Sequence, residues 1–183
     1  MGRSRKILLK GERVLLRTLT REDSRDIQVA ANDPEIAKYT PVPYPFSLED
    51  AVRLIDRSRN QINRGRDFFL GIEFTNVIVG MMGLLQVNHS EQKAKAEVGY
   101  WIGKDYRGRG LARESLGLIL NFGFYSEGLE RIWGRVTDGN IPSMKLLESC
   151  GFTQIARFPK IRSVGETLVD DLVYELTRRQ YTD

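Results

Sequence analysis

The chain has 183 residues, of which 41% are hydrophobic and 28% are charged, enough for one well-buried domain and short for two. We therefore expect a single domain over residues 1–183. No apolar run approaches the roughly 18 residues of a membrane span, and the N-terminal stretch lacks the apolar segment of a signal peptide. A cytoplasmic location without a membrane partner is expected.

The first predicted elements are a strand and a capped helix. Residues 12–19 are rich in β-branched and apolar side chains, which favours a strand. Thr20 and Asp23 have the spacing of a capping box. The helix that they begin is expected to stop near Pro34, because proline cannot continue it.

Residues 39–46 interleave three prolines with aromatic residues. Proline favours extended backbone, so no helix is expected there. The segment is either a plain linker between helices or a wall of a substrate pocket, and the sequence leaves both open. A second helix is predicted over residues 48–62, with Ser47 and Asp50 at its start and apolar residues along one face.

From Phe68 onward the apolar residues alternate as in strands, and two further helical patterns interrupt them. Strands are predicted over residues 68–74, 77–87, 95–102, 131–136, 152–161 and 166–176, and helices over residues 111–124 and 141–149. The order β-α-α-β-β-β-α-β-α-β-β indicates an α+β domain with a mixed central β-sheet flanked by helices. Its unit over residues 97–136 should be parallel and right-handed.

A basic, glycine-rich loop joins one of these strands to the next helix. The strand ends in Tyr100-Trp101-Ile102, Arg107-Gly108-Arg109-Gly110 follows, and helical spacing begins at Leu111. Amides at a helix N-terminus lack intrahelical partners and attract anions, and glycines let a phosphate approach the backbone. The loop predicts a phosphorylated ligand, unless it is an ordinary turn on a basic surface.

The pattern Arg107-x-x-Gly110-x-Ala112 resembles the acetyl-coenzyme A signature R/Q-x-x-G-x-G/A of the GNAT superfamily of N-acetyltransferases. It is not a kinase-type P-loop, in which lysine and a serine or threonine follow the last glycine. The order of elements is similar to the GNAT fold along nearly the whole chain. Four further segments resemble the branch of ribosomal-protein N-terminal (alanine or serine) acetyltransferases: Glu12-Arg13-Val14-Leu15-Leu16-Arg17, Asn32-Asp33-Pro34-Glu35, Asn140-x-x-Ser143 and Glu148-x-x-Gly151-Phe152.

This resemblance implies acetyl-coenzyme A as cosubstrate. Loop amides would hold its pyrophosphate, the strand end would pair with its pantetheine arm, and an asparagine at a later helix start would contact it. The implied coenzyme-binding residues are Tyr100, Trp101, Ile102, Arg107, Gly108, Arg109, Gly110, Leu111, Ala112, Arg113 and Asn140. Asn140 also suits a plain N-cap, and the side chains of Arg107 and Arg109 face either phosphates or solvent.

Glu97 is the candidate base. The two-residue period of a strand puts Glu97, Gly99 and Trp101 on one face of it. Some GNAT members use a glutamate on this strand, so the resemblance implies that Glu97 draws a proton from the attacking amine through water. The alternative is a structural glutamate paired with Lys93 or Lys95.

Ser143 is the candidate acid. In the resembled family a tyrosine usually protonates the departing thiolate, but Leu147 occupies that position here. Ser143 is the remaining hydroxyl, as in the ribosomal-protein branch, and is expected to supply the proton. Alternatively, Ser143 is only the third residue of a capped helix, and water or the amine is the acid.

The expected reaction is direct attack of a primary amine on acetyl-coenzyme A through a tetrahedral intermediate. Cys150 and Ser143 lack the activating histidine of a covalent route, and one cysteine with one histidine predicts no metal. The expected acceptor is the N-terminal α-amine of a protein, of the ribosomal-protein type. A small-amine acetyltransferase (for aminoglycosides, polyamines or amino metabolites), a basic RNA-binding protein and an inactive acyl-coenzyme A sensor are the alternatives. No DNA binding is expected, and the sequence leaves homodimer formation open.

Overall fold

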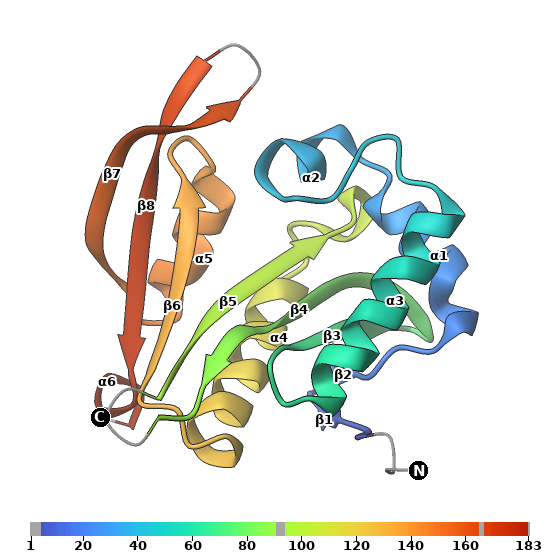
Figure 1. Cartoon of the computed structure of the whole chain (residues 1–183), viewed down its shortest axis with the longest axis horizontal. Helices are drawn as coiled ribbons and strands as arrows, with labels where there is room; N and C mark the ends of the chain where they lie inside the picture. The colour runs from blue at the N-terminus through green and yellow to red at the C-terminus, as the bar shows by residue number, and fades with distance from the viewer. Residues whose placement is uncertain (1–4, 91–93, 165–166, 183) are drawn as a thin grey trace.

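Eight strands form one sheet in the computed structural model, which describes residues 5–90, 94–164 and 167–182 (Figure 1). Neighbouring strands follow the order β1-β2-β3-β4-β5-β6-β8-β7. The strands are β1 (Leu8–Lys10), β2 (Val14–Arg17), β3 (Phe68–Phe74), β4 (Val77–Asn88), β5 (Lys95–Ile102), β6 (Arg131–Thr137), β7 (Thr153–Val164) and β8 (Thr167–Thr177). The helices are α1 (Ser24–Ala31), α2 (Pro34–Tyr39), α3 (Leu48–Asn63), α4 (Leu111–Asn121), α5 (Ile141–Ser149) and α6 (Arg178–Thr182).

The predicted α+β fold with a mixed sheet flanked by helices is confirmed. Strands β5 and β6, which α4 connects, pair in parallel as predicted, and the other neighbouring pairs in the described part of the chain are antiparallel. The last strand, β8, lies between β6 and β7. The predicted strand over residues 152–161 therefore forms the edge of the sheet.

Three short elements were absent from the predicted order: β1, α2 and α6. Pro34 was expected to end a helix, and it is in fact the first residue of α2. The Asp33 carboxylate caps α2 by accepting a hydrogen bond from the amide of Glu35, at 3.0 Å. Proline lacks only an amide hydrogen that the first helical residue does not use, so it can start one helix just after another has ended.

Each face of the sheet has its own apolar core. Ile27 of α1 and Ile55 of α3 pack with Met81 of β4 on one face. Leu116 and Ile119 of α4 belong to the larger core on the other face, and α3 and α4 are seen on opposite sides of the sheet in Figure 1. Burial of one such side chain contributes about 1.5–3 kcal/mol, so these cores fix both helical layers.

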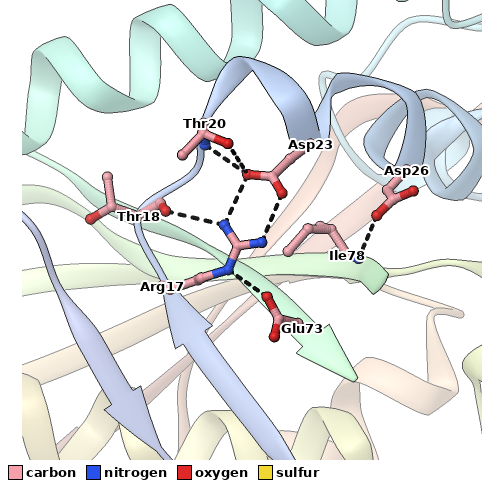
Figure 2. Close-up of polar contacts among 7 residues, drawn as sticks. All are labelled: Arg17, Thr18, Thr20, Asp23, Asp26, Glu73 and Ile78. Atoms are coloured by element: carbon pink, nitrogen blue, oxygen red, sulfur yellow. Dashed lines mark hydrogen bonds and ion pairs between the residues drawn. The ribbon is translucent and has the colours of Figure 1, made fainter. Parts of the chain in front are cut away.

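Arg17 ties the first helical layer to the sheet. Figure 2 shows its guanidinium between two carboxylates, with Asp23 accepting from both terminal nitrogens at 2.9 and 2.7 Å and Glu73 accepting from Nε at 2.5 Å. Asp23 also accepts from the amide of Thr20 at 2.7 Å, the backbone half of the predicted capping box. Burial opposes ionisation of Asp23, but the hydrogen bonds from Arg17 and Thr20 outweigh it and lower the pKa of the carboxyl.

Replacing Asp23 by asparagine should lower the free energy of unfolding by about 1–3 kcal/mol at pH 7, because Arg17 loses one of its two charged partners. Because the pKa of Asp23 is lower in the folded state, its ionised carboxylate stabilises the folded protein fully at pH values above the unfolded-state pKa of about 3.9. This contribution is lost as the pH falls through the folded-state pKa. Urea unfolding of the wild type and of Asp23→Asn should therefore differ at pH 7 and converge below pH ~4. Asp105→Asn, at an exposed position in a short 3₁₀ helix, is the control; an undiminished gap at low pH would contradict the role of this ion pair.

Candidate functional site

Strands β5 and β6 stay together only over three residue pairs, from Lys95 with Arg131 to Glu97 with Trp133. Beyond Glu97, the opposite edge of β5 remains paired with β4 as far as Ile102. Figure 1 shows β5 and β6 diverging from this point. The edge of β5 that faces β6 therefore presents backbone groups with which an extended ligand can pair.

A cleft of about 1950 Å³ opens where the strands diverge. Ligand pockets for one small molecule typically measure about 300–1,000 Å³, so this cleft has room for two ligands side by side. Residues of α3 and the segment before it line one side, β5 and β6 line the floor, and the starts of α4 and α5 line the other side. The predicted linker or wall over residues 39–46 lines the cleft through Tyr39, Pro41, Val42, Pro43 and Phe46, so it is a wall of this space.

The glycine-rich loop lies at the start of α4, as predicted. Gly108 and Gly110 have φ angles of 71° and 78°, in the left-handed region that glycine adopts without strain. The first hydrogen bond of α4 runs from the amide of Glu114 to the carbonyl of Gly110, at 3.1 Å. The amides of residues 111–113 therefore have no carbonyl partner within the helix and are available to an anion.

Arg13 fixes the loop from behind. Its Nη1 donates to the carbonyl of Arg109 at 2.9 Å, and its Nε donates to the Glu114 carboxylate at 3.0 Å. The same carboxylate accepts from the amides of Arg13 and Val14, at 2.6 and 3.2 Å. Burial works against ionisation of Glu114, and these hydrogen bonds overcome it and lower its pKa. The loop is thus held in shape without a ligand.

The Arg107 side chain turns toward the other wall of the cleft. Its Nη2 lies 2.6 Å from the Asp33 carboxylate, and its Nε donates to the carbonyl of Ile102 at 3.0 Å. Arg109 lies over the ring of Tyr106, 5.4 Å from its centroid. The Arg107 side chain was expected to face either phosphates or solvent. Its main contacts instead join the loop to the cap of α2.

A pair of hydroxyls lies across the cleft floor. The Tyr100 hydroxyl of β5 is 2.7 Å from Ser143 Oγ at the start of α5, and either group can be the donor. Burial raises the pKa of Tyr100 to about 12, although the hydrogen bond with Ser143 lowers it, so the phenol is neutral at physiological pH. Leu147, where a tyrosine was sought, is buried in the core.

Asn140 and Ser143 begin α5 as a capped helix. The Asn140 side chain accepts from the amide of Ser143 at 3.4 Å, so the structural interpretation of these residues is correct. Both residues also line the cleft. Capping therefore does not remove the expected contact with a ligand.

Glu97 lies at the point where the strands part and lines the cleft. Its carboxylate accepts from the side-chain amide of Gln86, at 3.2 Å. Gln86 belongs to the irregular stretch of β4 and has a φ of 53°. The expected alternative partner Lys93 lies outside the described residues.

The structure brings nearly all predicted site residues to one cleft. Arg109 is the exception, since its backbone carbonyl and side chain contact Arg13 and Tyr106 instead. The cleft-lining members of the predicted set are Glu97, Tyr100, Trp101, Ile102, Arg107, Gly108, Gly110, Leu111, Ala112, Arg113, Asn140 and Ser143. Sequence reasoning missed the side-chain roles of Arg13, Asp33 and Glu114, although the segments around Arg13 and Asp33 carried a resemblance.

The described residues contain no group of three or more histidine, cysteine, aspartate or glutamate side chains that could hold a metal ion. None of the helices in the described ranges is long and apolar enough to cross a membrane.

An amide-rich loop beside an open strand edge is the arrangement expected of an enzyme that holds a phosphorylated, extended cosubstrate. The family model described as acetyltransferase (GNAT) domain matches residues 13–153, well over half of the chain. The chain belongs to this family, and it is an N-acetyltransferase with acetyl-coenzyme A as cosubstrate.

The names of similar proteins give different acceptors, or no acceptor. An uncharacterized N-acetyltransferase, p20 of Bacillus licheniformis, is 29% identical over 93% of this chain and 96% of its own length. Spermidine N(1)-acetyltransferase of Escherichia coli K12 is 26% identical over 76% of this chain and 73% of its own. The structure of RimL, a ribosomal L7/L12 alpha-N-protein acetyltransferase in complex with coenzyme A, aligns with a TM-score of 0.84 over 93% of this chain and 98% of RimL. At 16% identity, that likeness concerns the fold.

Replacing Gly110 by valine should weaken coenzyme A binding at least tenfold, about 1.4 kcal/mol, while the protein stays folded. The new Cβ would lie 3.2 Å from Arg13 Nη2 and in a left-handed backbone conformation that costs other residues about 1–2 kcal/mol. Titration calorimetry with coenzyme A measures the affinity. Gly128→Val has a similar φ of 67° with no atom near its Cβ, and should bind normally. Unchanged affinity of Gly110→Val would contradict the loop assignment.

Proposed function

We propose that this enzyme transfers the acetyl group of acetyl-coenzyme A to a protein N-terminal α-amine, of the kind found on ribosomal proteins. The observation that carries the proposal is one cleft with an amide loop on one side and Glu97 at its apex, with space left for a second ligand. A peptide end is narrow and extended, and the unpaired stretch between β5 and β6 suits such a shape.

The coenzyme has a consistent place along one side of the cleft. Amides from Arg107 to Arg113 would hold its pyrophosphate, the edge of residues 100–102 that β6 leaves would pair with its pantetheine arm, and Asn140 would contact it from the cap of α5. The cosubstrate supplies a thioester carbonyl, and its orientation against the floor leaves the remaining space to the amine.

Glu97 serves as the base in this proposal. The amine nitrogen attacks the thioester carbonyl, its surplus proton passes through water to Glu97, and the carbon–sulfur bond then breaks. An α-amine has a pKa of about 7.7–8.0 against about 10.4 for lysine, so its neutral fraction at pH 7 is roughly 300-fold larger. A carboxylate at a cleft wall is a sufficient base for such an acceptor, and Gln86 keeps the carboxylate in place.

Ser143 serves as the acid. Its Oγ donates a proton to the departing sulfur, and Tyr100 donates a hydrogen bond that stabilises the developing charge on Oγ. Solvent returns the proton, so the one lost by the amine balances the one gained by the thiolate. Tyr100 is thus a positioning residue for Ser143.

A small amine is the second candidate acceptor, because a relative is named a spermidine acetyltransferase. The test is transfer of labelled acetyl into a mixture of unacetylated ribosomal proteins and small amines, with the products located by mass spectrometry. Label at a protein N-terminus supports the proposal. Label on a small amine alone replaces the acceptor, and coenzyme binding without any transfer favours the sensor alternative.

Replacing Glu97 by glutamine should lower kcat about 100-fold and leave the affinity for coenzyme A unchanged, because only the proton acceptor is lost. Steady-state rates between pH 6 and 9 should show that the variant regains activity at high pH, where the amine is already neutral. Glu22→Gln, at an exposed position in a short 3₁₀ helix, is the control. Equal turnover of Glu97→Gln and the wild type across this range would remove the base assignment.

Replacing Ser143 by alanine should lower kcat at least tenfold with little change in KM, because the lost proton matters only as the thiolate departs. Tyr100→Phe should cost less, about 2- to 13-fold, the worth of one hydrogen bond. The double variant should be no slower than Ser143→Ala alone, since Tyr100 acts through Ser143. Full activity of Ser143→Ala would make water or the amine the acid.

A further inference from the structure

Two arginines on the acceptor side of the cleft have no carboxylate partner. Arg57 of α3 and Arg64, the residue that caps the end of α3, line the cleft, and neither forms an ion pair within the described part of the chain. Arg53, on the same side of α3, is held by Glu49 and by Asp50 at 2.5 Å. Arg57 and Arg64 are therefore the arginines on this side of the cleft that remain available to a ligand.

The carboxylates that line the cleft are already engaged. Asp56 pairs with Arg21 at 2.7 Å, Glu35 lies 3.7 Å from Lys38, and Asp50 accepts from Ser47 at 2.9 Å and pairs with Arg53. Asp67 accepts from the amide of Gln86 at 2.8 Å, and Glu97 accepts from the side chain of the same residue. An incoming acceptor therefore meets Arg57 and Arg64 without a carboxylate partner, whereas Asp67 and Glu97 both lie against Gln86.

These cations are not ligands of the coenzyme loop. Arg57 lies on α3 and Arg64 caps its end, whereas the loop belongs to the start of α4, on the opposite side of the sheet (Figure 1).

The spacing along α3 matches an extended peptide. Seven residues separate Arg57 from Arg64, about 10 Å at 1.5 Å per helical residue. An extended chain advances about 3.3 Å per residue, so about three of its residues cover this distance. Carboxylates three positions apart on a peptide can therefore meet one arginine each.

We propose that the acceptor is an acidic N-terminal segment, with aspartate or glutamate among the few residues after its amine. This proposal rests on the proposed function and adds the charge of the substrate to it. A polyamine would bring its positive charges against Arg57 and Arg64 and is disfavoured at this site.

The test uses three peptides that share an N-terminal alanine and differ only at positions 2–6, which are acidic, glutamine or lysine. We measure kcat/KM with acetyl-coenzyme A, and fluorescence anisotropy with enzyme loaded with coenzyme A. The acidic peptide should bind about 5- to 10-fold more tightly than the lysine peptide at low salt, with the preference falling as salt screens it. Equal binding, or preference for the lysine peptide or for spermidine, overturns the inference.

Matched variants locate the effect. The double variant Arg57→Gln, Arg64→Gln should lose the preference for the acidic peptide. The KM for that peptide should rise, while kcat and the affinity for coenzyme A stay unchanged. Arg59→Gln, on the same helix but not lining the cleft, should keep it; loss of the preference in this control also overturns the inference. If the acidic peptide binds but no peptide is acetylated, the proposed transfer fails and the charge inference stands. If all three are acetylated equally, the proposed transfer stands and the charge inference fails.

Discussion

The early separation of β5 from β6 is the constraint on which the site depends. Three parallel pairs hold the strands together, and Glu97 belongs to the last of them. If pairing continued, the edge of residues 98–102 would be occupied by β6, and neither a pantetheine arm nor an acceptor could reach the floor. The fold thus leaves β5–β6 backbone hydrogen bonds unmade at the place where we propose that the substrates meet.

Side-chain contacts from distant segments hold the two sides of this opening. Arg13 and Glu114 hold the glycine-rich loop from behind, and Arg107 joins that loop to Asp33 at the start of α2. Because α2 leads directly into the wall over residues 39–46, the coenzyme side and the acceptor side share one ion pair. Such contacts reduce the ordering that binding would otherwise require.

The sequence predicted the local features well and the long-range ones poorly. Periodicity located β3 to β6, α4 and α5, and glycine spacing located the loop, since these signals lie within short windows. The short α2 was missed because the same proline ends one element and begins the next. The sequence carries no local signal for the contact of the Arg107 side chain with Asp33 or for that of Tyr100 with Ser143, 43 positions away. Both contacts depend on the assembled fold.

In the proposed arrangement, the two substrates are recognised by different kinds of groups. The coenzyme side offers amides, left-handed glycines and an open strand edge, features that many sequences can supply. The acceptor side consists of side chains on α3 and on the segment before it, and each substitution there changes charge or shape directly. Membership of the family therefore indicates the coenzyme and says little about the acceptor. For this chain, the acceptor has to be deduced from the arginines that face the cleft.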